Sequence, residues 1–125
     1  MTNEPADPTP VVWFNAACSK CRTAQGILTE HSVDATYLDY LDKPPTRTEL
    51  ENVLSMIGTD DPRAIARRNE PLWADLGLDD ATDDKVLAAL TRHPQLIERP
   101  IVIVGDRAVV ARPPELVLGL LTDPA

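Results

Sequence analysis

The sequence is poor in cysteine, in aromatic residues and in basic charge. Two of its 125 residues are cysteine, 4% are aromatic, and 20 acidic residues against 12 Lys and Arg give a formal net charge of -8. The two cysteines, Cys18 and Cys21, are too close in sequence to join distant parts of a fold, which excludes a structural disulfide framework. The excess of negative charge repels a phosphate backbone, so we expect no nucleic-acid partner.

Long apolar runs are also missing. No stretch approaches the roughly 20 apolar residues that span a bilayer, and the first ten residues are acidic and proline-rich, unlike a signal peptide. We therefore expect no membrane partner, a cytoplasmic location and a disordered N-terminal tail at residues 1–10. The hydrophobic content of 43% suits one compact domain over residues 11–121.

Metal-ligating residues are equally scarce. His31 and His93 are far from the cysteine pair in sequence, and no second CxxC is present to complete the four ligands that zinc takes. We expect no bound metal, and both histidines are interpreted as helix-end or surface residues. Trp13 and Trp73 are interpreted as packing residues, because two aromatic residues far apart in sequence do not define a binding face.

The N-terminal third of the chain has a β-α-β pattern. Residues 11–14 are β-branched and aromatic, which predicts a strand buried on both faces. Helical spacing of apolar residues follows over residues 19–30, with Ser19 as the expected cap, and residues 36–41 predict a second strand. The short helical crossover requires the two strands to be parallel.

The rest of the chain predicts a helical insertion and then a hairpin. Thr46 and Glu49 form a capping box that opens a helix ending near Gly58, and helical pieces over 62–69 and 83–92 follow, with a loop at 77–80 between them. Strands at 100–104 and 108–111 flank a tight turn, and Pro113-Pro114 opens a closing helix. The expected fold is α/β, a thioredoxin-like βαβ plus ββα mixed sheet with a helical insertion at about 46–93.

Cys18 falls at the junction between the first strand and the first helix. A helix N-terminus lowers the pKa of a thiol because its unpaired N–H groups favour the thiolate, and Lys20 and Arg22 add positive charge nearby. Cys21 lies one helical turn further on, within reach of a disulfide. Two cysteines can also serve as small apolar fillers, but a CxxC motif beside a βαβ unit favours a redox role.

Several motifs resemble the glutaredoxin-like arsenate reductases. The segment from Asn15 to Arg22, NAACSKCR, is similar to the active-site segment of that family. Further similar segments, in the family's order and approximate spacing, are residues 40–50, 63–71, 93–101 and 112–115. The resemblance extends from about Val11 to Leu121 and implies reduction of arsenate to arsenite, with Cys18 as the nucleophile.

The resemblance also implies an oxyanion site. Three arginines of the family bind the oxyanion, and the motifs place them here at Arg67, Arg99 and Arg112. Guanidinium groups offer planar, paired donors to an oxyanion and stay charged at any relevant pH. Each arginine alone is more simply a surface residue or the partner of an acidic group. The resemblance further implies a cis peptide bond before Pro100, opposite the nucleophile.

The chain departs from the family pattern in its active-site loop. Phe14 and Ala16 replace a common His and Pro, so thiolate formation depends on the helix and the arginines. Cys21 stands where the family commonly has Ser, and we hypothesise that it resolves the arsenic adduct by forming a Cys18–Cys21 disulfide. No bound cofactor is implied. The expected partners are arsenate and an external thiol reductant, namely glutathione, mycothiol, glutaredoxin or thioredoxin.

Three alternatives to arsenate reduction remain open. Spx-like redox-sensing regulators share this fold and the CxxC, but they lack the complete arginine set, so Arg67 and Arg112 favour the enzyme. A general thiol-disulfide oxidoreductase is the second function that fits these residues. The third is a relative of the family that keeps the fold and has lost its activity.

Overall fold

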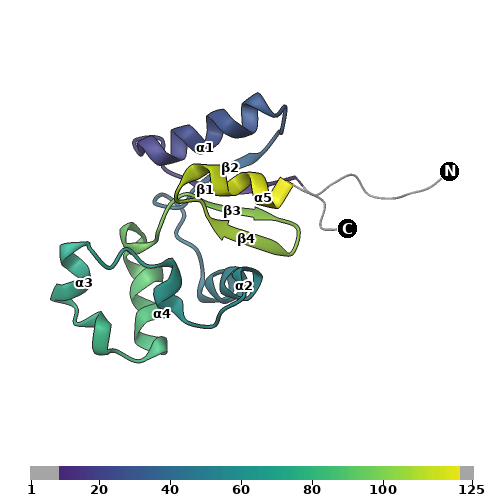
Figure 1. The fold of residues 1–125 in the computed structure, drawn as a ribbon. Coiled ribbons are helices and arrows are strands. Elements are labelled where there is room, and N and C mark those ends of the chain that lie inside the picture. The colour runs from purple at the N-terminus through teal and green to yellow at the C-terminus, as the bar shows by residue number, and fades with distance from the viewer. Residues whose placement is uncertain (1–8, 122–125) are drawn as a thin grey trace.

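The structure, a computed structural model, is built on one four-stranded mixed sheet and describes residues 9–121 (Figure 1). Residues 1–8 of the predicted tail lie outside the described residues. The strand order is β2-β1-β3-β4, in which β1 pairs parallel with β2 and antiparallel with β3, and β3 pairs antiparallel with β4. The strands are β1 (Val11–Phe14), β2 (Thr36–Asp39), β3 (Ile101–Val104) and β4 (Arg107–Val110).

Helices cover both faces of this sheet (Figure 1). Helix α1 (Ser19–Glu30) joins β1 to β2 and lies on one face together with the short α5 (Leu118–Leu121). On the other face lies the helical segment between β2 and β3. It contains α2 (Arg47–Ile57), α3 (Pro71–Asp75) and α4 (Asp83–Arg92). The expected α/β class with a thioredoxin-like arrangement is therefore confirmed.

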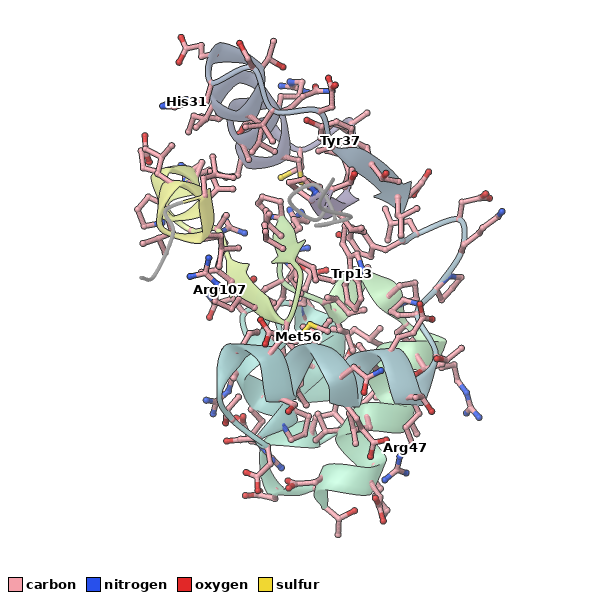
Figure 2. All side chains as sticks on the ribbon, turned by 90° about the vertical axis from the view of Figure 1, so that its right-hand side faces the viewer. Trp13, His31, Tyr37, Arg47, Met56 and Arg107 are labelled. Atoms are coloured by element: carbon pink, nitrogen blue, oxygen red, sulfur yellow. The ribbon has the colours of Figure 1, made fainter. Side chains whose placement is uncertain are left out.

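The central strand β1 sends alternate side chains into two cores, because successive residues of a strand point to opposite faces. Val12 packs with the α1 side and Trp13 with the side of the helical segment. Figure 2 shows the same division, with Tyr37 of β2 on the side of α1 and Trp13 on the side of the helix that carries Met56. The strand is thus buried on both faces, as its composition predicts.

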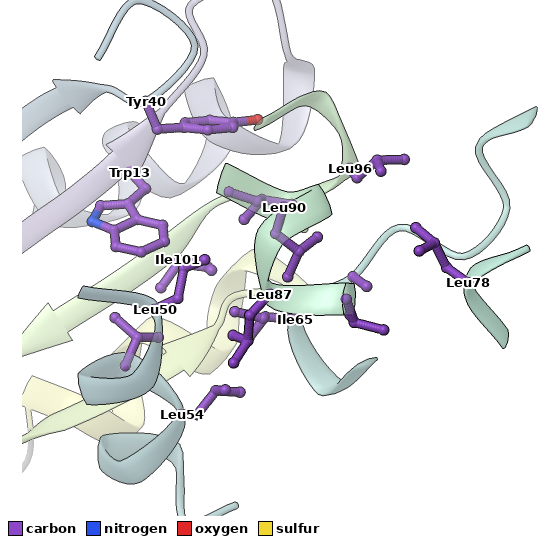
Figure 3. Close-up of a cluster of buried hydrophobic side chains, with 14 of the residues drawn as sticks. Trp13, Tyr40, Leu50, Leu54, Ile65, Leu78, Leu87, Leu90, Leu96 and Ile101 are labelled. Atoms are coloured by element: carbon purple, nitrogen blue, oxygen red, sulfur yellow. The ribbon is translucent and has the colours of Figure 1, made fainter. Parts of the chain in front are cut away.

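The larger core lies under the helical segment (Figure 3). Leu50, Leu54, Leu87 and Leu90, from α2 and α4, pack there against Ile101 of β3. Burial of each large apolar side chain contributes roughly 1.5–3 kcal/mol. Helix α2 starts at the predicted capping box, in which Glu49 N–H donates to Thr46 Oγ1 at 3.2 Å and Thr46 N–H donates to Glu49 Oε1 at 2.9 Å. It ends at Gly58, whose φ of 102° is in the left-handed region that glycine adopts without strain.

The C-terminal part forms the predicted hairpin and closing helix. Gly105, with φ 62°, lies in the turn between β3 and β4. A 3-10 helix, Pro114–Val117, precedes α5. The Arg99–Pro100 peptide bond is cis, as the family resemblance implies, and so is Arg112–Pro113. None of the helices within residues 9–121 has the length and apolar character needed to cross a membrane.

Some local predictions are wrong. Strand β2 ends at Asp39 and not at 41, because the Asp39 carboxylate accepts bonds from Leu41 N–H (3.0 Å) and Asp42 N–H (3.2 Å) and folds the chain into a turn. The residue at the N-cap of α1 is Cys18, so Ser19 is the first helical residue and not the cap. The predicted piece at 62–69 is helical only over Pro62–Ile65, as a 3-10 turn. Three short helices lie where none was predicted, namely α3 and the 3-10 turns Leu78–Asp80 and Pro94–Leu96.

Candidate active site

The loop between β1 and α1 is folded by Asn15. Its side-chain Oδ1 accepts a hydrogen bond from Ala17 N–H at 2.9 Å, and its carbonyl oxygen accepts one from Cys18 N–H at the same distance. Arg22, one turn into α1, donates from Nη1 to the Ala16 carbonyl at 2.9 Å. These three bonds fix the loop, so Cys18 stands at the N-terminus of the helix.

Cys18 is a thiol with a lowered pKa. The residue is 9% exposed, and this burial by itself raises the pKa. Burial is outweighed by hydrogen bonds from the backbone N–H of Cys21, from the Cys21 side chain and from the backbone N–H of Lys20, together with the positive charge of Arg99. Backbone donors at a helix N-terminus stabilise an anion in this way. Donors at the helix start and the charge of Arg99 thus favour the thiolate of Cys18, while Lys20 contributes through its backbone N–H.

Cys21 has the opposite character. It is fully buried, and burial raises its pKa to about 11, assisted by the nearby charge of Cys18. Around neutral pH it is therefore a protonated thiol that donates a hydrogen bond to Cys18. One sulfur favours the anion while its neighbour keeps its proton, which is the asymmetry required of an attacking and a second thiol.

The guanidinium group of Arg99 is close enough for its charge to act on both cysteines. Its Nε and Nη1 atoms are buried, and neither has a hydrogen-bond acceptor among the described residues. Its charge acts on Cys18, on Cys21 and on Tyr40. Buried polar groups are normally satisfied, so a guanidinium in this condition points to an anionic ligand that supplies the missing acceptors.

The side chains of the other two predicted arginines contact the segment of chain that contains Arg99. Arg112 donates from Nη1 to the Arg99 carbonyl at 3.4 Å, and the same nitrogen lies 3.8 Å from Glu98 Oε1. Arg67 Nε lies 4.0 Å from that oxygen. The structure thus gathers the three arginines, from separate parts of the chain, around residues 98–99.

Backbone hydrogen bonds hold these segments in place. Glu98 N–H donates to the Ile65 carbonyl at 2.8 Å, and Arg67 N–H donates to the Leu96 carbonyl at 2.6 Å. On the other side, Ala111 N–H donates to the Pro100 carbonyl at 2.9 Å. The residues that precede Arg67 and those that precede Arg112 are therefore both hydrogen-bonded to the segment that contains Arg99.

Two residues of the site were not predicted. Tyr40 is 3% exposed, and burial raises its pKa to about 12, while the charges of Arg99, Cys21, Arg67 and Cys18 also act on it. Its ring borders the larger core (Figure 3). Glu98 is the other. Both lie in segments that carry the family resemblance, but neither has a spacing that signals a role.

The remaining candidates lie away from the arginines or serve the fold. His31 caps the end of α1, with Nδ1 2.9 Å from the Ile27 carbonyl, and His93 is the C-cap of α4. Trp13 and Trp73 are core residues. Within residues 9–121 there is no group of three or more His, Cys, Asp or Glu side chains arranged to hold a metal ion.

The sheet order, the cysteine pair at the first helix and the cis bond before Pro100 together define a thioredoxin-like domain of the thiol-redox class. Residues 13–120 match the ArsC family, and the chain belongs to that family.

Similar proteins are named arsenate reductases. One from Neisseria meningitidis serogroup A is 36% identical over 91% of this chain and 99% of its own length. Another from Haemophilus influenzae is 36% identical over 89% of this chain and 97% of its own. The solved structure of the arsenate reductase from Vibrio cholerae is 35% identical, with a TM-score of 0.87, covering 91% of this chain and 98% of that one.

Proposed function

We propose that this protein is a thiol-dependent arsenate reductase that converts arsenate to arsenite, with Cys18 as the nucleophile. The observation that carries the proposal is a thiol of lowered pKa beside Arg99, whose buried Nε and Nη1 have no acceptor among the described residues. The names of the relatives, at 36% identity over most of the chain, support the choice of substrate.

The arginines bind and polarise the oxyanion. Arg99 donates to an arsenate oxygen from Nε and Nη1, for which residues 9–121 supply no acceptor, and Arg67 and Arg112 add positive charge. Arsenate neutralises this cluster, and the cluster in turn withdraws electron density from arsenic. The Cys18 thiolate attacks arsenic, an As–O bond breaks, and the oxygen leaves as water after it takes up protons.

Cys21 completes the reduction within the chain. It loses its proton, its sulfur attacks the Cys18 sulfur, and the electron pair of the S–As bond stays on arsenic, which leaves as arsenite. Arsenic(V) gains two electrons as two thiols become one disulfide, so the balance is arsenic acid plus two thiols to arsenous acid, a disulfide and water. An external reductant, namely glutathione, mycothiol, glutaredoxin or thioredoxin, then reopens the Cys18–Cys21 disulfide.

Arsenate-dependent oxidation of a coupled reductant tests the proposal. Wild-type protein is assayed with thioredoxin and its reductase, and separately with glutaredoxin plus glutathione and with mycothiol. We expect turnover that requires arsenate and is abolished in Cys18→Ser. The matched control is Ser55→Ala, a change of similar size on α2, a helix that carries none of the site residues, which should keep full activity. Wild-type protein that turns over with none of these reductants would sink the proposal.

The role of Cys21 has its own test. Cys21→Ser should lose turnover with thioredoxin as sole reductant and should accumulate an arsenic adduct at Cys18, detected by intact-protein mass spectrometry. A small thiol should restore part of its activity by attacking that adduct from solution. Unchanged turnover with thioredoxin alone would remove Cys21 from the mechanism.

The buried thiol pair also supports a second function, general thiol-disulfide exchange, because a CxxC of this asymmetry suits reduction of protein disulfides. Reduction of insulin disulfides without arsenate distinguishes it. Activity there, together with indifference of Arg99→Gln in the same assay, would favour the general oxidoreductase.

A further inference from the structure

Glu98 lies between two of the three arginines. Its Oε1 atom is 4.0 Å from Arg67 Nε and 3.8 Å from Arg112 Nη1. Both separations exceed hydrogen-bond length, so the carboxylate attracts both cations through charge without engaging their N–H groups in hydrogen bonds. A negative side chain of this protein thus already stands in the cluster that the proposed oxyanion would enter.

The three guanidinium groups therefore differ in how many of their nitrogens already have an acceptor or a carboxylate nearby. Arg67 has a carbonyl or carboxylate near each of its three nitrogens: Nη1 donates to the Gln95 carbonyl at 3.4 Å, and Nη2 and Nε form longer ion pairs, 3.6 Å to Glu70 Oε2 and 4.0 Å to Glu98 Oε1. Arg112 shares Nη1 between Glu98 and the Arg99 carbonyl. Arg99 alone of the three has two buried nitrogens without an acceptor among residues 9–121. An oxyanion gains the full interaction at Arg99 and shares the other two arginines with Glu98.

We propose that Glu98 weakens non-covalent oxyanion binding at the arginine cluster and so limits how much of the site phosphate occupies. The inference rests on the proposed function for the place of the site. A fixed negative charge about 4 Å from two guanidinium groups cancels part of their positive potential and repels a second anion. The repulsion grows with the charge of that anion, so dianions are affected most.

Weak binding of this kind has a use when two anions share shape and charge. Phosphate and arsenate are both tetrahedral and carry the same charges near neutral pH, so guanidinium groups alone cannot separate them. Only arsenate is reduced after attack by a thiolate, because phosphorus(V) is not reduced by thiols. Glu98 lowers the non-covalent binding of both anions to the same degree, the reaction with the Cys18 sulfur makes the choice between them, and the effect of Glu98 is to lower the fraction of sites that phosphate occupies. The cluster therefore stays open in the presence of phosphate.

Phosphate binding provides the test and does not depend on turnover. Inorganic phosphate is titrated by isothermal calorimetry into wild type, Glu98→Gln and the control Glu51→Gln, which makes the same chemical change at an exposed ion pair with Arg47. We expect Glu98→Gln to bind phosphate about five- to tenfold more tightly, the effect of one partly exposed charge next to a bound ion. Glu51→Gln should match wild type. Where the protein reduces arsenate, phosphate should inhibit Glu98→Gln at correspondingly lower concentration.

A merely structural role predicts the reverse. If Glu98 only held the arginines in position, its loss would weaken phosphate binding, and equal or weaker binding in Glu98→Gln overturns the inference. Glu98→Asn is a second neutral variant, and failure of both to fold would show that the carboxylate is needed for the fold, which also overturns it. Absence of phosphate binding in wild type and variants alike does the same. Tighter phosphate binding by Glu98→Gln in a protein that does not reduce arsenate would reject the proposed function and keep the inference.

Discussion

Two arginines of this molecule, Arg63 and Arg99, differ in how their guanidinium groups are satisfied. Arg63, in the helical segment, donates from Nη1 to Asp83 at 3.0 Å and Asp61 at 3.4 Å, and from Nη2 to the carbonyls of Leu78 and Ala81. Arg99, beside the cysteine pair, has two buried nitrogens without an acceptor in the described part of the chain.

The difference separates an arginine that stabilises the fold from one reserved for a ligand. Arg63 ties the 3-10 turn Leu78–Asp80 and the start of α4 to its own segment, so its hydrogen bonds are used within the protein. The unused donors of Arg99 lower the stability of the empty protein, because they are desolvated without compensation. Three variants separate these two roles.

The largest effect is expected at Arg99. Arg99→Gln should lower kcat/KM for arsenate by about 100-fold or more, the range for removing a preorganised donor to developing negative charge. Its free energy of unfolding should stay equal to wild type or rise, because buried unpaired donors are removed. Coupled kinetics and urea unfolding measure the two quantities. A variant that loses stability and keeps its activity would place Arg99 in the same class as Arg63.

Arg63→Met should have the reverse profile. Its loss removes the donor to the Ala81 carbonyl and one of the two donors to the Leu78 carbonyl, which keeps Ala81 N–H, and the free energy of unfolding should fall by about 2 kcal/mol. The side chain is 17% exposed, so the methionine retains most of its apolar contacts. Folded protein should keep the arsenate kinetics of wild type. Urea unfolding checks the first expectation, and a large drop in kcat/KM at full folding would contradict the second.

A smaller effect is expected on the pKa of Cys18. Arg99→Gln removes a positive charge that favours the thiolate, so the pKa should rise, although the helix donors remain. The pH profile of iodoacetamide alkylation at Cys18 should move to higher pH in this variant and stay unchanged in Arg63→Met. Cys21, with a pKa of about 11 and no exposed surface, should resist the reagent at neutral pH in both. An unshifted profile in Arg99→Gln would remove Arg99 from the activation of the thiol.

The smallest effect is expected at Arg47. Its ion pairs with Glu51 and Asp84 are on the surface, with half of the arginine side chain exposed, and such pairs contribute little. Arg47→Ala should leave both the urea midpoint and the arsenate kinetics at wild-type values. A clear loss of stability would show that surface pairing alone is enough for an arginine to stabilise this fold, which would weaken the contrast.

Local chemistry explains which parts of the fold the sequence predicts. The capping box of Thr46 and Glu49, the glycine turn at Gly105 and the alternation of β1 are all set by neighbouring residues, and each is found. Helix α3 was not predicted, because Pro71–Asp75 is too short to display a helical period. The end of β2 depends on a carboxylate of Asp39 that could equally have stayed in a strand.

The features of the candidate site also divide into those set by residues close in sequence and those set by the tertiary structure. Cys18 and the helix start are close in sequence, so the lowered pKa follows from local order. The arginines were placed by resemblance to a family, since no periodicity links residues 67, 99 and 112, and the fold brings them together through backbone bonds between distant segments. Glu98 had no signal in the sequence. Its meaning comes from the side chains on either side of it, which only the tertiary structure supplies.

The complete burial of Cys21 behind the slightly exposed Cys18 imposes an order on the chemistry. A reagent arriving from solvent meets the outer sulfur first, and the inner sulfur reacts only with what the outer one already holds. A mixed disulfide with a partner protein would therefore form through one cysteine of the pair, and its release would come from inside the domain. Accidental capture of the second thiol by foreign electrophiles is prevented by position alone.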